Sequence, residues 1–95
     1  MADPIRVVRV RIEGRVQGVN YRAWTQETAM TLGLTGWVRN RRGGTVEALF
    51  AGTAAAVEAM LGHCRKGPLA ARVTAVTIEQ EGGEAPAGFD IKPTQ

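Results

Sequence analysis

The sequence predicts an α+β fold in which two helices cover one face of an antiparallel sheet. Two observations support this prediction: several segments alternate or are rich in β-branched and aromatic residues, and two segments between them carry apolar residues at helical spacing. The order strand, helix, two strands, helix, strand corresponds to the split βαβ or ferredoxin-like sandwich (βαββαβ). With 95 residues, the chain has the length of one domain, and we expect a single domain over residues 1–95.

A strand, a loop and a helix are predicted in the first third of the chain. Over residues 6–13, valine and isoleucine alternate with arginine and glutamate, which predicts a half-buried strand. After residues 14–20 the period changes, and apolar residues recur at helical spacing from Tyr21 until Gly33 supplies a stop. We therefore expect a strand that continues through a glycine-containing loop directly into a helix.

A β-hairpin is predicted in the middle of the chain. Residues 35–40 and 45–50 are rich in Val, Thr, Trp and Phe, and they flank an Arg-Arg-Gly-Gly connection over residues 41–44. Glycines suit a hairpin connection that needs positive φ. We therefore expect two antiparallel strands.

The last third of the chain predicts a second helix and a return to β-structure. Thr53 offers a capping hydroxyl, and the apolar stripe that follows ends at Cys64, before Gly67. Residues 72–79 are again β-rich, and residues 89–91 form a short terminal strand after a glycine-rich loop.

Composition and charge narrow the classes of function. The net charge is +3 and ten of the twelve basic residues are arginine, whose planar guanidinium group binds phosphate or carboxylate through paired hydrogen bonds. Cys64 is the only cysteine and His63 the only histidine, so no ligand set for a structural zinc ion exists. No segment approaches the ~20 apolar residues of a membrane span, and no export signal marks the N-terminus, so we expect a cytoplasmic protein without a membrane partner.

The segment over residues 14–22 has the features of an anion-binding loop. Backbone N–H groups at the first turn of a helix carry partial positive charge, and glycines allow close approach of a phosphate. Arg22 would add charged donors to the same oxygens. A simple connector has the same composition, so at this level both interpretations stay open.

Two strings in the sequence resemble the signatures of the acylphosphatase family. The first is VRIEGRVQGVNYR over residues 10–22, and the second is GWVRN over residues 36–40. The resemblance covers nearly the whole chain and extends through residues 44–47, Gly52, Gly67-Pro68, residues 71–73 and Gly88-Phe89. Tyr21 stands where phenylalanine is frequent in the family, which is a conservative difference.

The resemblance implies roles for the first loop and for one residue of the hairpin. It implies phosphate binding, through loop amides and one guanidinium group, by Arg15, Val16, Gln17, Gly18, Val19, Asn20, Tyr21 and Arg22. It further implies that Arg22 and Asn40 are the catalytic residues, with the Asn40 amide orienting the attacking water. Without the resemblance, Asn40 would be interpreted as a turn residue at the shoulder of a hairpin.

The implied reaction is hydrolysis of the carboxyl–phosphate bond of an acyl phosphate, by direct in-line attack of water, without metal or cofactor. The residues agree with this reaction. The chain contains no serine, so a hydrolase that uses a serine nucleophile is excluded. An acyl phosphate needs no general acid, because its leaving carboxylate has a pKa around ~4 and departs without a proton. Phosphoryl transfer then needs mainly positioning and charge stabilisation. We therefore expect a small-molecule acyl phosphate substrate, competitive inhibition by phosphate or sulfate, and a monomer.

Three alternatives share the predicted fold. A nucleic-acid-binding module of this strand order uses aromatic residues on its central strands, but residues 45–52 offer only Phe50 and residues 8–12 offer none, so we expect no nucleic-acid partner. A copper or zinc carrier needs a cysteine pair in the first loop, and residues 15–21 contain none. An acylphosphatase-like domain within a larger maturation enzyme for carbamoyl transfer stays open, although we expect a free-standing protein because the chain ends soon after its last strand.

Other conspicuous residues have structural explanations. The arginines within residues 39–42 either raise the local positive potential or form a solvated hairpin tip. We expect Trp24 and Trp37 to pack in or beside the core, His63 to be solvated near a helix end, and Cys64 to be buried.

Overall fold

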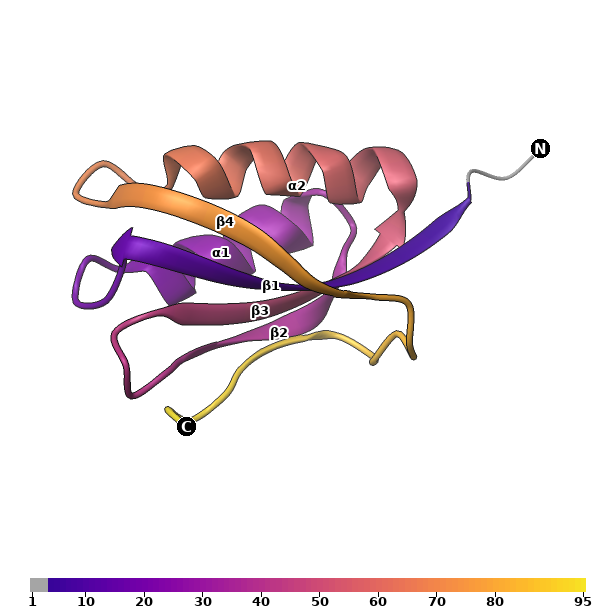
Figure 1. The fold of residues 1–95 in the computed structure, drawn as a ribbon. Helices are drawn as coiled ribbons and strands as arrows, with labels where there is room; N and C mark the ends of the chain where they lie inside the picture. Colours follow the sequence, from indigo (N-terminus) through magenta and orange to yellow (C-terminus); the bar gives the residue numbers. More distant parts are fainter. Residues whose placement is uncertain (1–3) are drawn as a thin grey trace.

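The computed structural model describes residues 4–95 and contains every predicted strand and helix (Figure 1). The elements are β1 (Ile5–Arg15), α1 (Tyr21–Thr31), β2 (Thr35–Asn40), β3 (Val46–Thr53), α2 (Ala54–Lys66), β4 (Arg72–Glu81) and β5 (Phe89–Ile91). The ferredoxin-like α+β prediction is confirmed, with both helices packed on one face of the sheet. The first three residues of the predicted domain lie outside the described residues.

The sheet has the strand order β4-β1-β3-β2-β5. Its first four strands pair antiparallel, as predicted, whereas β5 pairs with β2 in parallel, with Phe89 opposite Gly36 and Ile91 opposite Val38. The sheet is therefore mixed at one edge rather than antiparallel throughout. The physical reason is that the chain leaves β4 at one edge and returns beside β2 at the other, as the yellow segment of Figure 1 shows.

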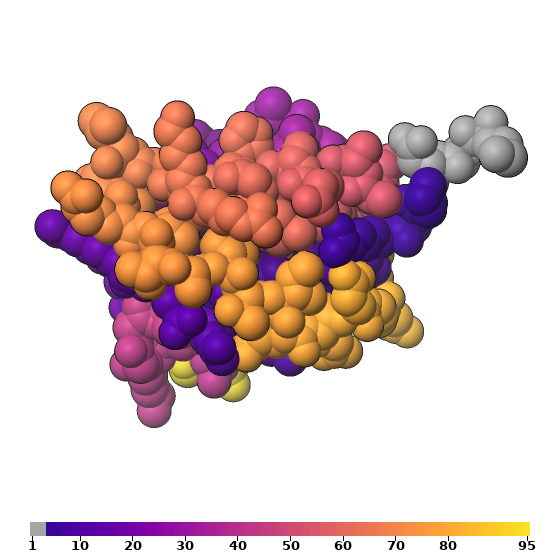
Figure 2. Space-filling view, turned by 45° about the horizontal axis from the view of Figure 1, so that its top comes forward, coloured from indigo at the N-terminus to yellow at the C-terminus, as the bar shows by residue number. Residues whose placement is uncertain are grey.

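The core lies between the sheet and the helices. Alternation along β1 places Val8, Val10 and Ile12 on the helix-facing side, where each is fully buried, while the arginines between them face the opposite side. Complete burial of one such side chain stabilises the fold by roughly 1.5–3 kcal/mol. The α2 helix lies along β4 (Figure 2) and contributes Met60 and Cys64 to the same core. The predicted burial of Cys64 is thus confirmed.

Two local features explain the course of the middle strands. The hydroxyl of Thr53 accepts a hydrogen bond from the Ala56 backbone N–H at 3.1 Å, so the predicted cap begins α2 directly after β3. Gly36 has φ +148°, and a Cβ at this position would lie 1.8 Å from the backbone oxygen of Leu49. Only glycine therefore allows β2 to approach β3 at this point.

Candidate active site

The loop between β1 and α1 leaves the backbone donors of the first helical turn without a side-chain cap. Asn20 is the N-cap residue of α1 and adopts a left-handed conformation, with φ 66°, and its side chain makes no capping hydrogen bond. Gly18 also has positive φ, at 75°. No acidic residue lies in the first turn of α1. Uncapped N–H groups at a helix N-terminus, without a competing carboxylate, favour the binding of an anion.

A cavity of about 230 Å³ opens at this helix N-terminus. It is lined by Val16, Gly18, Asn20, Tyr21, Arg22, Ala23, Asn40 and Ile91. We call it the loop cavity. The structure thus brings Arg22 and Asn40, from the separate elements α1 and β2, to the same cavity, and Arg22 is the only charged residue among those that line it.

The predicted phosphate-binding residues separate into two groups. Five residues of the stretch 15–22 line the loop cavity, whereas Arg15, Gln17 and Val19 do not. Arg15 is the exposed last residue of β1 and pairs in register with Arg72. Val19 packs against the core, and Gln17 contacts the hairpin, as described below.

The side chain of Tyr21 anchors the first turn of α1 to α2. Its ring is buried, its hydroxyl donates a hydrogen bond of 2.8 Å to the backbone oxygen of Cys64, and its centroid lies 5.2 Å from that of Trp24. Burial raises the pKa of the Tyr21 phenol. The hydroxyl therefore has a structural role, because its hydrogen bond holds the first turn of α1 against α2. A phenylalanine at this position would lack this hydrogen bond.

Asn40 is the last residue of β2 and shares the helix-facing side of the strand with the fully buried Val38. Its backbone oxygen accepts a hydrogen bond of 3.1 Å from the N–H of Gln95. Its side-chain oxygen Oδ1 is buried and has no hydrogen-bond partner among residues 4–95. A buried acceptor without a partner costs roughly 1–3 kcal/mol, so this oxygen is free to accept a hydrogen bond from a group in the loop cavity, whose lining also includes Arg22.

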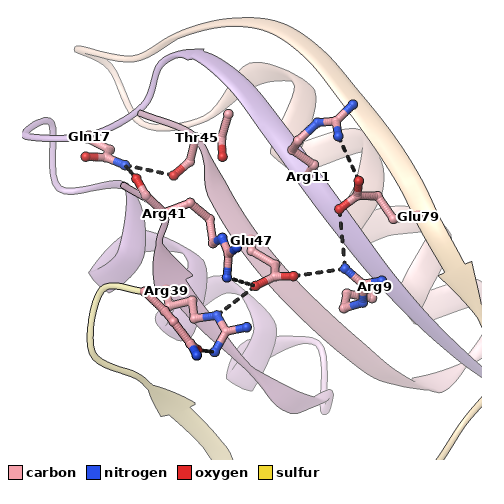
Figure 3. A network of polar contacts seen from close by, with 9 residues as sticks. Arg9, Arg11, Gln17, Arg39, Arg41, Thr45, Glu47 and Glu79 are labelled. Carbon is pink, nitrogen blue, oxygen red and sulfur yellow. Dashed lines mark hydrogen bonds and ion pairs between the residues drawn. The ribbon is translucent and has the colours of Figure 1, made fainter. Parts of the chain in front are cut away.

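The two arginines that flank Asn40 point to the open face of the sheet and bind one carboxylate (Figure 3). Arg39 Nε donates to Glu47 at 2.7 Å, and Arg41 forms an ion pair with the same carboxylate at 3.6 Å. Arg9 adds a third contact, at 2.9 Å. Neighbouring residues along a strand face opposite sides of the sheet. Because Glu47 holds the side chains of Arg39 and Arg41 on the open face, the Asn40 side chain between them faces the cavity.

Burial alone would raise the pKa of Glu47, but hydrogen bonds from Arg39 and Arg9 and the charges of Arg39 and Arg41 outweigh it and hold that pKa below its usual range. Glu47 in turn compensates the positive charge of Arg39 and Arg41. Of the arginines expected to raise the potential beside Asn40, only Arg42 has no ion-pair partner among residues 4–95, and its side chain is exposed.

Gln17 connects the loop to the β2–β3 hairpin. Its side-chain amide nitrogen donates to the backbone oxygens of Arg41, at 2.7 Å, and Thr45, at 2.8 Å (Figure 3). Both amide hydrogens are thereby used, so the Gln17 side chain ties the loop to the end of β2. This contact lies one residue from Asn40 and fixes its position relative to the loop.

Sequence reasoning missed two residues of the cavity, Ala23 and Ile91. Ala23 follows Arg22 in the first turn of α1, so its position could have been inferred from the helix. Nothing local in the sequence indicates Ile91, because its position depends on the crossing of the chain from β4 to β5.

The structure agrees with the predicted places of Trp24 and His63, but the expectation that Trp37 packs in or beside the core is wrong, because alternation along β2 turns its side chain to the face opposite the buried Val38. Trp24 packs against the core, and the half-buried Trp37 lies on the open face, with Arg39 and Lys92 each 4.8 Å from its ring centroid. His63 is exposed on α2. Among residues 4–95, no three His, Cys, Asp or Glu side chains gather as a metal site. The helices in this part of the chain are too short or too polar to cross a membrane.

Comparison with known proteins gives one consistent result. A family model described as acylphosphatase matches residues 8–91. The chain is 56% identical over 90 residues to an acylphosphatase of Rhodospirillum rubrum, covering 95% of this chain and 99% of the relative, and 50% identical over 92 residues to one of Rhizorhabdus wittichii, covering 96% and 93%.

Solved structures give the same match. The structure of an acylphosphatase from Coxiella burnetii has a TM-score of 0.88 at 31% identity, covering 93% of each chain. Full-length HypF, at 23% identity and a TM-score of 0.85, covers 99% of this chain, which spans 13% of HypF. That second likeness shows the fold alone.

Proposed function

The chain belongs to the acylphosphatase family and shares its enzymatic activity, and from this premise we propose that Arg22 and Asn40 carry out the reaction in the loop cavity. The observation that carries the proposal is the convergence of an uncapped helix N-terminus, one guanidinium group and one unpartnered amide oxygen on a single cavity. The proposed products are a carboxylate and orthophosphate.

Phosphate binding is assigned to Arg22 and to the backbone amides of the loop. A tetrahedral dianion accepts hydrogen bonds from several N–H groups at once, and the helix dipole adds favourable potential at the same place. The planar guanidinium group of Arg22 holds two oxygens in register. Because these donors are preorganised, they also stabilise charge on the phosphoryl oxygens in the transition state.

The attacking water is assigned to Asn40. The unpartnered Oδ1 accepts one hydrogen of this water, which directs an oxygen lone pair toward phosphorus, opposite the departing carboxylate. The second proton of the water passes to a phosphate oxygen of the substrate. The leaving carboxylate needs no proton, since the pKa of its acid is around ~4. The step therefore balances without a general acid or base from the protein.

The test compares variants at the two residues on benzoyl phosphate, with release of orthophosphate as the readout. Arg22→Ala weakens phosphate inhibition and slows turnover, because Arg22 binds the phosphoryl group in both ground and transition states. Asn40→Ala lowers kcat about 10² to 10³-fold while the inhibition constant of phosphate stays near its original value. Arg65→Ala and Gln80→Ala, at exposed positions outside the cavity lining, serve as matched controls.

Near-normal turnover of a folded Asn40→Ala would remove Asn40 from the mechanism. Loss of phosphate binding in the same variant would instead assign Asn40 to the phosphate site.

Metal independence is tested separately. No ligand set is available among residues 4–95, and we expect hydrolysis of benzoyl phosphate to survive exhaustive chelation. Phosphate and sulfate should compete with the substrate, while a phosphate monoester stays uncleaved. Loss of activity with chelator and recovery with added magnesium or zinc would contradict this mechanism. Three expectations stay predictions: the absence of a nucleic-acid partner, the monomeric state and the cytoplasmic location.

A further inference from the structure

We propose that Ile91, with Ala23, forms the wall of the loop cavity that receives the acyl group, and that it selects acyl phosphates whose acyl group is apolar and uncharged. This inference rests on the function proposed above, because it concerns the part of the substrate that the phosphate-binding groups do not contact. It narrows the substrate class from acyl phosphates in general to those with aromatic or short aliphatic acyl groups.

The strand β5 places Ile91 beside the reacting groups. Ile91 pairs in parallel register with Val38, two residues before Asn40, and it lies on the same side of β5 as the buried Phe89. Its side chain lines the loop cavity, yet the residue is 41% exposed. A large aliphatic side chain with this much open surface at a cavity gains free energy when an apolar group covers it.

The charges around the cavity disfavour a second ionised group on the substrate. Arg22 is the only charged lining residue, and the phosphoryl group occupies it. Three of the four cations nearest in sequence to Asn40 and Ile91 are engaged on the open face: Arg39 and Lys92 lie over the Trp37 ring, and Arg41 pairs with Glu47. The fourth, Arg42, is exposed and lies outside the cavity lining. A second carboxylate or phosphate on the acyl group would be desolvated in the cavity without a counter-charge.

A cationic acyl group is disfavoured by the same lining, since no carboxylate is among the lining residues. The cavity volume of about 230 Å³ lies below the ~300 Å³ of the smallest common ligand pockets. It therefore suits a phosphoryl group together with a compact acyl group rather than an extended one.

The experiment measures kcat and KM of the full chain for benzoyl, acetyl and succinyl phosphate, which carry an aromatic, a methyl and an anionic acyl group. The variants are Ile91→Ala and Ile91→Lys. The matched control is Ile78→Ala, because Ile78 is exposed to a similar degree, 39%, but lies on β4 outside the cavity lining. Thermal unfolding and the inhibition constant of phosphate report whether the fold and the phosphate site are intact.

For the unaltered protein, we expect kcat/KM to be highest for benzoyl phosphate and lowest for succinyl phosphate. Ile91→Ala should raise KM for benzoyl phosphate roughly 4- to 15-fold, as expected for the loss of one or two methylene contacts, with kcat nearly unchanged. Acetyl phosphate should respond less, because its methyl group covers less of Ile91. Ile91→Lys should improve succinyl phosphate relative to benzoyl phosphate.

The inference is overturned if Ile91→Ala and Ile78→Ala have equal effects, or if succinyl phosphate is preferred over benzoyl phosphate by the unaltered protein. An unchanged substrate ranking in Ile91→Lys would also overturn it. Failure of the proposed function is a different result, since the unaltered protein would then release no phosphate from any of the three substrates.

Discussion

Replacement of Glu47 by glutamine should destabilise the protein strongly at neutral pH and only weakly in acid. The carboxylate side chain is 9% exposed and accepts hydrogen bonds from Arg39 at 2.7 Å and Arg9 at 2.9 Å, with Arg41 at 3.6 Å. Removing one partner of a fully buried ion pair costs about 3–5 kcal/mol. The arginines here are 20–42% exposed, and water screens part of the interaction, so we expect a loss of about 2 kcal/mol.

The pH dependence has a definite sign. The pKa of Glu47 in the folded protein is lowered below its ordinary value, so the folded state binds fewer protons at this group than the unfolded state does. Its stabilising contribution is therefore fully present above the unfolded pKa, around ~4.3, and is lost as the pH falls through the lowered folded value. The gap between Glu47→Gln and the unaltered protein should close over that acid range.

Thermal unfolding followed by circular dichroism measures this effect. For a domain of this size, about 2 kcal/mol corresponds to a decrease in Tm of about 8–16 °C. Glu58→Gln is the matched control, because Glu58 also pairs with an arginine, Arg6 at 3.0 Å, but its side chain is 68% exposed. Equal changes in Tm for the two variants at neutral pH, or a Glu47→Gln gap that persists undiminished near pH 3, would refute the reasoning.

Three further variants test the framework around the loop. Gln17→Ala removes two hydrogen bonds to the hairpin, so the free energy of unfolding should fall by about 1–2 kcal/mol and the inhibition constant of phosphate should rise; unchanged phosphate inhibition would show that the tether does not position the loop. Tyr21→Phe leaves the backbone oxygen of Cys64 without its donor and should cost about 1–3 kcal/mol in urea unfolding, and a cost near zero would contradict the anchoring role. Burial raises the pKa of the Cys64 thiol to about 12, so thiol-blocking reagents and Cys64→Ala should leave turnover largely intact. Loss of turnover with both, in a protein that is still folded, would show that the thiol is catalytic.

The sequence by itself determined the order of the elements and the position of the loop. Alternation in β1 and helical spacing in α1 arise from contacts between residues close in the chain, and such patterns can be recognised in a linear sequence. The resemblance to a known family added Arg22 and Asn40, and the structure places both at one cavity. Local spacing alone left Asn40 as a turn residue.

Only the tertiary structure decided how the loop, the hairpin and the last strand meet. The parallel pairing of β5 with β2 puts Ile91 at the cavity, and the Gln17 side chain reaches backbone oxygens 24 and 28 residues away. Glu47 carries no local sign that it binds the two arginines on either side of Asn40. These contacts join residues on different strands, and their geometry follows from strand register and chain crossing, which depend on the packing of the whole sheet rather than on any short segment.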